Sequence, residues 1–454
     1  MKKIKNTITL LLTVFVVSQI YAQEEAKLNV TNLSTLPAKD KETKSFGYAG
    51  MLGGVYSDVI IAAGGANFPN GLPWKGGKKV WSDAIYYLEE DQWKLAETKL
   101  PIPLAYAASV TTKKGVLSIG GNNAEITSDK VFLIKYDAQK IEVIEYPSLP
   151  EPLAYTAATI VDDYVYVVGG KNSKNSTNSF YRLNLKQKQS WEKLTDFPGL
   201  PRAVHTIAVQ ETTTNKKLFV IGGRNQVAGK KSETLTNYLS YDFKEQKWEN
   251  EGELAIDGKT KVLMGASSET KGSMHIMLYG GSDEIIFDQL ENISLQINSA
   301  QNDTIIKNLT AKRDLLLNNH QGFSNEILAY NTITKKWFVY DTVKTTIPVT
   351  ALAFKNKDDF TIVSGEISPG IRTPDVLQFK VNENAYSFGI INYSVLAIYL
   401  LISVLIGLYF ARKQKSTEDY FTGGGRIPWW AAGLSVFGTL LSAITFMAIP
   451  AKSF

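Results

Sequence analysis

The chain has 454 residues, of which 44% are hydrophobic and 20% are charged, and its formal net charge at pH 7 is +5. This charge is small and no stripe of Lys and Arg interleaved with aromatic residues is present, so nucleic-acid binding is disfavoured. The sequence has no cysteine, so cysteine usage says nothing about the redox compartment. No group of His, Asp and Glu has the spacing of metal ligands, and we expect no metal site.

The first residues are typical of a secretory signal. Three of the first five residues are lysine, an apolar run follows over residues 8–20, and Ala22 provides a small residue at a plausible cleavage point. We expect residues 1–22 to be removed, so that the mature protein begins near Gln23.

A repeated pattern follows the signal. A strand-like run that ends in a pair of small residues recurs, and most repeats are roughly 50 residues apart, which is the kelch period. Because a four-stranded blade cannot bury both of its faces alone, the pattern predicts an all-β, six-bladed kelch β-propeller over residues 23–385. The fifth unit is longer and holds an insertion over residues 284–325. The pairs are Gly64-Gly65, Gly120-Gly121, Gly169-Gly170, Gly222-Gly223, Gly280-Gly281 and Ser364-Gly365.

The two ends of the repeat region are complementary. The outermost strand of most units carries a tryptophan, at Trp93, Trp191, Trp248 and Trp337, but the sixth unit, over residues 345–381, has no such strand. Residues 27–37 look like an outermost strand without a blade. We expect this N-terminal strand to complete the last blade, which leaves no open sheet edge. The alternative is that residues 27–37 form a flexible leader.

Polar residues follow the small-residue pairs. Because each pair ends an equivalent strand, these residues are expected to ring one mouth of the propeller, where hydrogen-bonding side chains suit a polyhydroxylated ligand. Each asparagine alone is also a common turn former, so a structural role is the alternative. We expect ligand contacts from Asn67, Asn122, Arg224 and Asn225, and the same rim includes Asn172, Asp283 and Glu366.

A charged pair flanks a predicted turn in the sixth unit. Pro369-Gly370 is typical of a turn, so Glu366 and Arg372 are expected to face each other across a hairpin. A guanidinium can bind the carboxylate of an acidic sugar bidentately, while a carboxylate moves a proton at the anomeric hydroxyl. A structural salt bridge at the base of the hairpin is the alternative. We expect His205 to be structural.

Two uncharged stretches near the C-terminus are long enough to cross a bilayer. Residues 390–410 and 427–450 contain no charged residue, and each exceeds the roughly 20 residues of a spanning helix. The loop between them, residues 411–426, is basic, which predicts that it is cytoplasmic and that the preceding domain is outside. We therefore expect contact with the lipid bilayer. A buried helix of a soluble protein is the alternative.

Three segments of the repeat region resemble a known family. GEISPGIRT (residues 365–373), GYAGMLGGVYSDVIIAAGGANFP (residues 47–69) and LPRAVHTIAV (residues 200–209) are similar to the cyclically permuted mutarotases, the kelch family typified by bacterial N-acetylneuraminate epimerases. The resemblance covers about residues 24–381. It implies interconversion of α- and β-sialic acid through ring opening at C2, with Glu366 and Arg372 as the catalytic pair and no cofactor. The fifth-unit insertion is divergent, so another acylated or acidic sugar stays open as the substrate.

A segment near the end of the chain resembles a second family. Residues 416–450, which include PWW, GLS and SAITF, are similar to the start of the sodium/solute symporters. In these transporters the first core helix is broken near mid-membrane, and its unwound backbone binds Na⁺. The resemblance implies part of a Na⁺ site at Gly438, Leu441 and Ser442 in a full-length transporter. Gly438 and Ser442 could equally form a small-residue packing seam.

These features together predict a periplasmic sugar mutarotase that is tethered to the bacterial inner membrane by the truncated start of a sodium/solute symporter. The expected partner is an acidic amino sugar such as sialic acid. The chain stops shortly after its second predicted span, so we expect a fragment of a longer fusion, with a truncated product as the alternative. Two other functions stay open, namely a non-catalytic propeller that captures the sugar and a kelch scaffold for a protein partner.

Overall fold

The structure is a computed structural model, and it describes residues 27–38, 44–187, 190–283, 285–382 and 389–413. The chain divides into two compact units, Ala26–Asn382 and a second unit whose described part is helix α4 (Gly389–Lys413). The predicted signal of residues 1–22, the predicted second span of residues 427–450 and the sodium residues Gly438, Leu441 and Ser442 lie outside the described residues.

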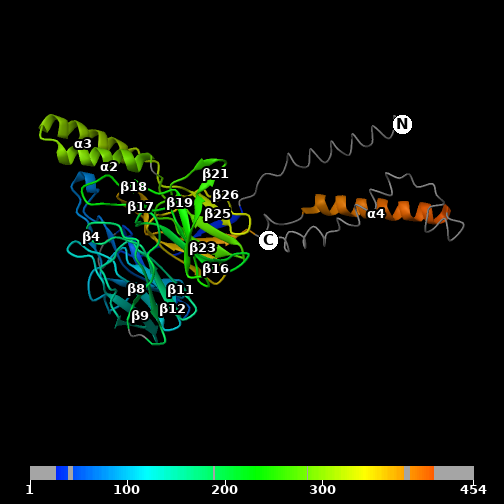
Figure 1. Cartoon of the computed structure of the whole chain (residues 1–454), viewed down its shortest axis with the longest axis horizontal. Coiled ribbons are helices and arrows are strands. Elements are labelled where there is room, and N and C mark those ends of the chain that lie inside the picture. The colour runs from blue at the N-terminus through cyan, green and yellow to red at the C-terminus, as the bar shows by residue number, and fades with distance from the viewer. Residues whose placement is uncertain (1–26, 39–43, 188–189, 284, 383–388, 414–454) are drawn as a thin grey trace. The chain divides into compact units, whose positions relative to one another are not determined.

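The first unit is a six-bladed β-propeller, and each blade is an antiparallel sheet (Figure 1). The strands of blade 1 are β2 (Ala49–Tyr56), β3 (Val59–Asn67), β5 (Ile85–Glu89) and β6 (Gln92–Leu95), with β4 (Val80–Trp81) paired to β3. The strands of blade 2 are β7 (Ala108–Thr112), β8 (Gly115–Ile119), β9 (Val131–Asp137) and β10 (Lys140–Tyr146). The strands of blade 3 are β11 (Ala157–Val161), β12 (Tyr164–Val168), β13 (Phe180–Asn184) and β14 (Glu192–Lys193).

The second half of the ring repeats this plan. The strands of blade 4 are β15 (Thr206–Glu211), β16 (Lys216–Ile221), β19 (Asn237–Asp242) and β20 (Lys247–Glu253). The strands of blade 5 are β23 (Ser267–Lys271), β24 (His275–Tyr279), β25 (Glu326–Asn331) and β26 (Lys336–Thr342). The strands of blade 6 are β27 (Leu352–Asn356), β28 (Asp359–Val363), β31 (Val376–Val381) and β1 (Leu28–Asn32). Short hairpins add β17 (Arg224–Asn225) with β18 (Glu233–Thr234), β21 (Ala255–Ile256) with β22 (Lys259–Thr260), and β29 (Glu366–Ser368) with β30 (Ile371–Arg372).

The hydrophobic core lies between the blades. The second strand of a blade is covered on both faces by neighbouring blades, so its sequence is largely apolar, as in the fully buried β8 and the nearly buried β12. One cluster, for example, joins Leu117 and Ile119 of blade 2 to Val165 and Val167 of blade 3. The outer strands alternate between buried and exposed residues, as β10 does, because one of their faces meets solvent. This difference explains why the strand before each small-residue pair gives the clearest repeat signal.

The N-terminal strand forms the outer edge of blade 6. β1 pairs antiparallel with β31, with Leu28 opposite Val381 and Asn32 opposite Leu377. Leu28 is only 4% exposed, and it packs in one cluster with Leu377 and Phe379. Residues more than 340 positions apart in the chain therefore share one sheet, and the ring closes through their backbone hydrogen bonds.

A closed ring of six backbone hydrogen bonds surrounds the centre of the propeller. One residue from each blade donates its N–H to the carbonyl oxygen of the equivalent residue in the preceding blade, over 2.7 to 3.2 Å. All six residues have positive φ, between 47° and 67°, and four of them are not glycine although this conformation costs a non-glycine residue roughly 1–2 kcal/mol. Strained residues of this kind gather at binding and active sites. The ring members are Gly50, Tyr106, Tyr155, Val204, Gly265 and Thr350.

The small-residue pairs are required by close backbone approach. A side chain at Gly120 would overlap the carbonyl oxygen of Leu153 in the next blade, and one at Gly222 would overlap that of Leu263. Both glycines also have positive φ, 68° and 59°. The pairs therefore bring the residues that follow them close to the neighbouring blade and to the mouth of the propeller.

The insertion in the fifth unit is a helical hairpin between β24 and β25. It consists of α2 (Ile285–Ser299) and α3 (Asp303–Asn318), and the side chain of Asn302 caps α3 by accepting hydrogen bonds from the N–H groups of Thr304 and Ile305. Figure 1 shows the hairpin projecting along one edge of the propeller. The sequence predicts an insertion here, and the structure shows that it is α-helical.

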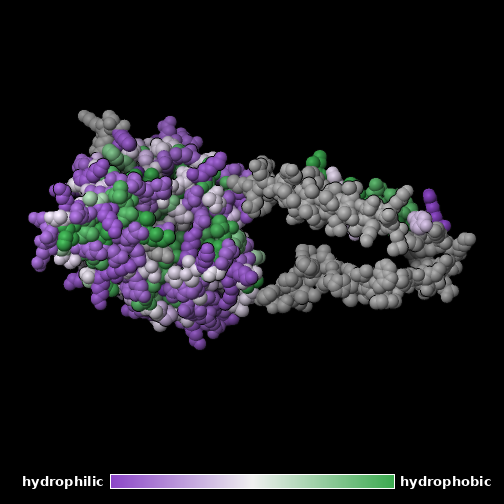
Figure 2. Space-filling view, turned by 90° about the horizontal axis from the view of Figure 1, so that it is seen from above, coloured by the Kyte–Doolittle hydropathy of each residue, from purple (hydrophilic) through white to green (hydrophobic). Residues whose placement is uncertain are grey.

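Helix α4 is long and apolar enough to cross a membrane. Within it, Asn392–Tyr409 is an 18-residue segment with a mean hydropathy of 1.8, and none of it is buried. Its exposed apolar residues include Ile390, Leu401 and Leu405. Figure 2 shows hydrophilic residues over much of the visible propeller surface and hydrophobic residues on α4. Among the described residues it is the one helix of this kind, and it covers the predicted span of residues 390–410.

Candidate functional site

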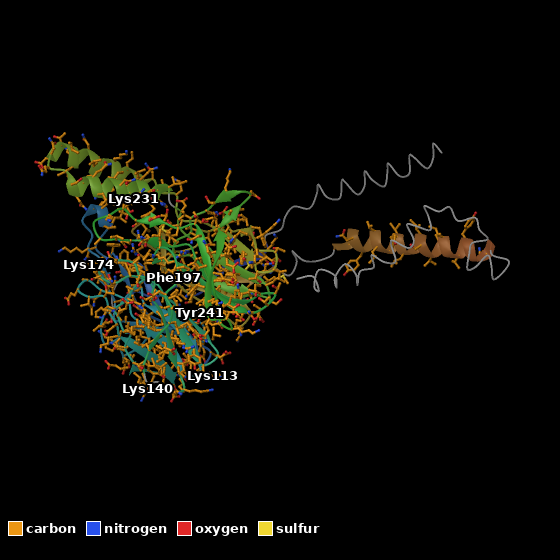
Figure 3. The ribbon with its side chains drawn as sticks, in the orientation of Figure 1. Lys113, Lys140, Lys174, Phe197, Lys231 and Tyr241 are labelled. Carbon is orange, nitrogen blue, oxygen red and sulfur yellow. The ribbon has the colours of Figure 1, made fainter. Side chains whose placement is uncertain are left out.

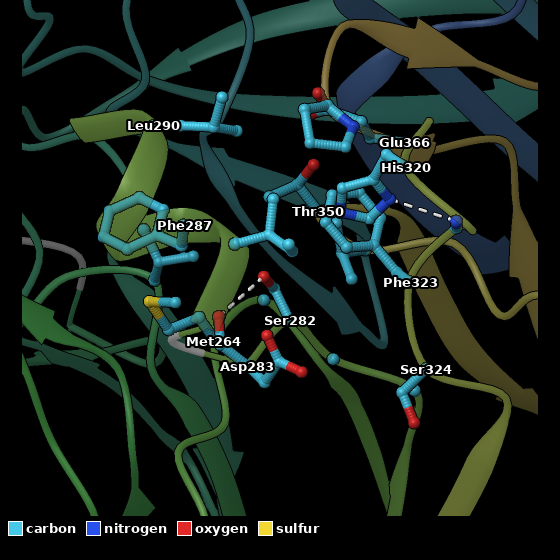
Figure 4. Close-up of a pocket in the computed structure, with 18 of the residues that line it drawn as sticks. Met264, Ser282, Asp283, Phe287, Leu290, His320, Phe323, Ser324, Thr350 and Glu366 are labelled. Carbon is cyan, nitrogen blue, oxygen red and sulfur yellow. Dashed lines mark hydrogen bonds between the residues drawn. The ribbon is translucent and has the colours of Figure 1, made fainter. Parts of the chain in front are cut away.

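A cavity of about 1000 Å³ opens at the mouth of the propeller where the residues after the small-residue pairs gather. Its floor includes members of the central hydrogen-bonded ring, and its outer wall comes from the helical hairpin. Figure 4 shows Phe287 and Leu290 of α2 on one side of the cavity, and His320, Phe323 and Glu366 on the other. The lining includes Lys79, Tyr106, Tyr155, Arg224, Asp283, Thr350, Glu366 and Arg372.

Glu366 and Arg372 face each other across the β29–β30 hairpin. They are directly opposite in the register, and Arg372 Nη1 lies 3.3 Å from Glu366 Oε1. The backbone N–H of Gly370, in the turn, donates a 2.6 Å hydrogen bond to the same oxygen. The side chains of Arg372 and Glu366 are 5% and 18% exposed, so the pair is largely desolvated at the cavity wall. One short hairpin therefore holds both groups rigidly.

Arg372 has hydrogen-bonding capacity to spare. Its Nε and Nη1 atoms are buried and donate no hydrogen bond to any residue that the structure describes. Nη1 still forms the ion pair with Glu366, but Nε has no partner of either kind among the described residues. Buried polar groups are normally satisfied, so this unpartnered Nε–H at a cavity wall is suited to an anionic ligand. The guanidinium also lies over the ring of Phe68, 4.6 Å from its centroid, which fixes its plane. A purely structural salt bridge would leave this donor capacity unused.

Lys79 and two tyrosines lie next to this pair. Lys79 Nζ is 4.4 Å from the centroid of the Tyr106 ring and 5.1 Å from that of Trp81. The Tyr106 ring stacks on Tyr155 with centroids 4.3 Å apart. Burial, with a further contribution from the positive charge of Arg372, lowers the pKa of Lys79 to about 8. Burial raises the pKa of Tyr155 to about 12, so this phenol stays neutral.

Arg224 and the helical hairpin form the opposite wall. The guanidinium of Arg224 lies 4.7 Å from the ring centroid of Phe287 on α2, and burial lowers its pKa. The apolar residues Phe287, Leu290, Leu315 and Leu316 of the hairpin complete this wall. They create a surface suited to the apolar part of a ligand, beside a cation suited to its polar part.

The hairpin is fastened at both sides of the cavity mouth. Lys231, labelled in Figure 3, forms a 2.6 Å ion pair with Asp288 of α2. Glu291 accepts hydrogen bonds from the N–H and hydroxyl of Ser232, next to β18 of blade 4. On the other side, the indole N–H of Trp74, in the 3₁₀ helix η1 (Pro73–Lys75) of blade 1, donates to the side chain of Asn318.

His320 follows the hairpin and also lines the cavity. Its Nδ1 accepts a 3.0 Å hydrogen bond from the N–H of Gly322. Burial lowers its pKa, while Asp283 and Glu366 act in the opposite direction. The net shift is downward, which favours the neutral form of this imidazole.

The other residues expected on the rim lie in different surroundings. The side-chain amide of Asn67 is buried and donates to the carbonyl oxygen of Gly47. The side chain of Asn122 is partly buried, and its Oδ1 has no hydrogen-bond partner among the described residues. Asn225 pairs with Glu233 in the β17–β18 hairpin. Of the predicted ligand contacts, Arg224 lines the cavity, whereas these three asparagines are not among its lining residues in the described part of the chain.

The residues expected on the rim occupy two different positions of the repeat, namely the first and the second residue after a small-residue pair. The first residue after a pair forms an antiparallel β-bridge with the residue that precedes a member of the central hydrogen-bonded ring. Asn122 pairs in this way with Ala105, and Arg224 pairs with Ala203. Asn67, Asn172 and Asn225 occupy the second position. Asn172 acts there as a turn former, because its side-chain oxygen accepts from the N–H groups two and three residues later.

His205 is remote from this chemistry. It is buried, its two ring nitrogens have no hydrogen-bond partner among the described residues, and burial lowers its pKa to about 3. It borders a second cavity of about 600 Å³ in the central channel. Within the described ranges, no group of three or more His, Cys, Asp and Glu residues could hold a metal ion.

Several lining residues were missed by the sequence reasoning. Tyr106 and Tyr155 stand at equivalent places in blades 2 and 3, and both follow the same Pro-Leu-Ala tripeptide. That repeated PLAY motif is a signal that could have identified them. Lys79, Phe287 and His320 have no such local signal, since their position depends on how loops from different blades meet.

Comparisons with known proteins place this site in context. The chain is 59% identical over 69 residues to a sodium/sialic acid symporter of Proteus mirabilis, and 61% identical over 70 residues to one of Aliivibrio fischeri; each match covers 15% of this chain and 14% of the relative. It is 35% identical over 107 residues to the N-acetylneuraminate epimerase of Yersinia enterocolitica, which is 21% of this chain and 27% of that protein. The chain thus spans well under two thirds of these relatives.

The family comparison covers far more of the chain. A model of the N-acetylneuraminate epimerase family matches residues 12–143 and 146–395, a range that includes all six blades. Together with the symporter matches, this supports a fusion of an epimerase-type propeller with part of a sialic acid transporter. The chain therefore belongs to the N-acetylneuraminate epimerase family.

Proposed function

We propose that this protein interconverts the α and β anomers of N-acetylneuraminate, or of a closely related acidic amino sugar. The observation that carries the proposal is the buried pair of Glu366 and Arg372 at the wall of the cavity. Membership of the epimerase family supports it. A cavity of about 1000 Å³ is also at the upper end of the roughly 300–1000 Å³ typical of small-molecule sites.

Arg372 provides the binding group for the sugar carboxylate. In sialic acid the carboxylate is bonded to C2, the carbon that changes configuration. The Nε–H of Arg372, which is buried without an acceptor among the described residues, suits a charge-assisted hydrogen bond to this carboxylate. Such an interaction brings C2 next to Glu366, because the two side chains are 3.3 Å apart.

Glu366 provides the base for ring opening. Its carboxylate takes the proton of the C2 hydroxyl, the C2–O bond to the ring oxygen breaks as the C2 carbonyl forms, and the ring oxygen gains a proton. Rotation about the C2–C3 bond presents the other carbonyl face, and reversal of the same steps closes the ring as the opposite anomer. The Gly370 N–H keeps Glu366 in place during both proton transfers.

The aromatic and apolar walls of the cavity are suited to a reaction from which water is excluded. Tyr106 and Tyr155 supply an aromatic floor, and Phe287 and Leu290 supply an apolar wall. Removing water strengthens the electrostatic interactions of the substrate with Arg372 and Glu366. The apolar wall is suited to an acyl substituent of the sugar.

The proposed reaction takes place outside the cytoplasm, in the periplasm, with the propeller anchored to the inner membrane. The predicted signal of residues 1–22 and the apolar helix α4 support this arrangement. The similarity to sialic acid symporters supports delivery of the preferred anomer to a transporter in the same polypeptide. Gly438, Leu441 and Ser442 are the proposed partial Na⁺ site of that transporter.

Proton NMR tests the reaction directly. N-acetylneuraminate that has just been released as the α anomer by a sialidase is mixed with the full chain in detergent micelles, and the anomeric ratio is followed over time. We expect the β anomer to form faster than in a protein-free blank. Binding without acceleration would favour a capture function, and neither binding nor acceleration would favour a protein scaffold.

A further inference from the structure

Opening a sugar ring requires two proton transfers, and the proposed function assigns one of them. Glu366 removes the proton of the C2 hydroxyl, but the ring oxygen must gain a proton as the C2–O bond breaks. Both oxygens are bonded to the same carbon, so the second group has to lie close to Glu366. The titratable side chains of the cavity wall near Glu366 and Arg372 are Lys79, Tyr106, Tyr155 and His320.

Lys79 has the geometry that such a group needs. Its position is fixed by the adjacent strand β4, in which Trp81 pairs with Ala66 of blade 1. Its Nζ lies against the faces of Tyr106 and Trp81, which cannot take its proton. Within the described part of the chain, Nζ has no ion-pair or hydrogen-bond partner. An ammonium held only by aromatic faces at a cavity keeps all three N–H donors available to a ligand.

We propose that Lys79 is the second proton-transfer residue of the mutarotase, and this inference rests on the proposed function. During opening, Glu366 takes the proton of the C2 hydroxyl. The bond between C2 and the ring oxygen breaks, its electron pair goes to the ring oxygen, and the Lys79 ammonium donates a proton to that oxygen. During closure, the sugar hydroxyl returns its proton to the Lys79 amine and attacks C2, and Glu366 returns its proton to the carbonyl oxygen. Protons and charges balance over the cycle, and no other reactant is needed.

The acidity of Lys79 matches this role better than that of its neighbours. Burial and Arg372 lower its pKa to about 8, and a general acid is most effective when its pKa lies near the working pH. Burial raises the pKa of Tyr155 to about 12 and raises that of Tyr106 as well, so both phenols are weak acids. His320 accepts a hydrogen bond at Nδ1 from Gly322, and burial lowers its pKa, so the imidazolium form that would act as the acid is disfavoured.

Charged groups from several walls of the cavity surround Lys79. Arg372 lowers the pKa of Lys79 and Glu366 raises it, both from the β29–β30 hairpin. The other charged groups lining the cavity are Arg224, Lys261, Asp283, Glu291 and Glu326. Since burial is the main cause of the shift, the activity that needs the ammonium is expected to be present below pH 8 and to fall as the pH rises through the pKa of Lys79.

Two substitutions at Lys79 separate proton transfer from simple charge. Lys79→Met removes the proton and the charge, whereas Lys79→Arg keeps a positive charge that does not titrate near neutral pH. The matched control is Lys78→Met, because Lys78 is exposed and adjacent in the same loop. Initial rates of α-to-β conversion are measured by proton NMR with the full chain in detergent micelles, minus the protein-free blank, at pH values that bracket the pKa of about 8.

We expect both Lys79 variants to lose about 10²- to 10⁴-fold in kcat, with a smaller change in KM and without the fall in rate near pH 8, while Lys78→Met behaves as the wild type. Retention of kcat and of the pH profile in Lys79→Arg would overturn the proposal and leave Lys79 as an electrostatic contact. A rise in KM alone in both variants would overturn it too. If the wild type does not accelerate the reaction, the proposed function fails and Lys79 loses this role with it; if the wild type is active and the Lys79 variants match it, only the Lys79 inference fails.

Discussion

Replacing Arg372 with alanine is the most direct test of how the cavity binds an acidic sugar. The Arg372 side chain is 5% exposed, two of its nitrogens are buried without a hydrogen-bond acceptor among the described residues, and Phe68 supports the guanidinium plane. The substitution therefore removes a desolvated, rigid pair of donors. It also leaves the Glu366 carboxylate without its neighbouring cation, although the hydrogen bond from Gly370 remains.

The size of the effect follows from this burial. Removing one partner of a buried, hydrogen-bonded charge pair between protein and ligand costs about 2–5 kcal/mol. Since each 1.4 kcal/mol corresponds to a tenfold change in Kd, we expect Arg372→Ala to weaken binding of the stable β anomer by about 30- to 4000-fold. Turnover of the α anomer should be lost as well, because the substrate is no longer held with C2 beside Glu366.

The assay is isothermal titration calorimetry of N-acetylneuraminate into the full chain in detergent, with circular dichroism to verify that the variant folds. Arg182→Ala is the control, because Arg182 forms a 2.7 Å ion pair with Glu192 on the outer strands of blade 3, away from the cavity. It should leave Kd unchanged. An unchanged Kd in a folded Arg372→Ala variant would refute the assignment of the carboxylate to this residue and would favour a structural salt bridge.

Three further predictions concern catalysis and the propeller itself. Glu366→Gln should abolish anomer exchange measured by NMR while calorimetric binding of the sugar persists, and unaltered turnover would remove Glu366 from the mechanism. Leu28→Ala should lower the free energy of unfolding by about 2–5 kcal/mol, because Leu28 is buried in blade 6. Thr31 on the same strand is exposed, so Thr31→Ala should have little effect. Equal urea midpoints for the two variants would show that β1 does not contribute to closure. Gly120→Ala should destabilise the protein by more than the roughly 1–2 kcal/mol of a positive φ alone, because the added methyl group overlaps a carbonyl oxygen of the next blade. Gly229 has a φ of 73° but open space around it, so Gly229→Ala should show only the backbone cost. An equal loss of thermal stability in the two variants would contradict this explanation.

The blades could be predicted from the sequence because their signals are local. The strand that precedes each small-residue pair is buried on both faces, so its apolar residues form a continuous run that ends in glycine. The hairpin of Glu366 and Arg372 is equally local, since a Pro-Gly turn between them fixes their register within seven residues. In both cases the information is contained in a few consecutive residues.

The composition of the cavity could not be predicted in the same way. Lys79, Tyr155 and Phe287 come from three different blades or loops, and they meet because the ring of six backbone hydrogen bonds holds the blades around one centre. The insertion was visible as a break in the repeat, but its length and polarity do not reveal that α2 and α3 turn an apolar face to the cavity. The anchoring contacts to Ser232 and Trp74 decide that.

The amino-acid sequence by itself thus determined the six-bladed propeller, the apolar segment now seen as α4, and the pairing of Glu366 with Arg372, because each depends on short-range periodicity or on one turn. Only the tertiary structure decided that Lys79 shares a cavity with this pair, that Asn67 is a buried structural residue, and that β1, the strand predicted to complete the last blade, pairs with β31 in the register of Leu28 opposite Val381. These features depend on ring closure between residues hundreds of positions apart, where backbone hydrogen bonding and burial, rather than local pattern, select the neighbours of each side chain.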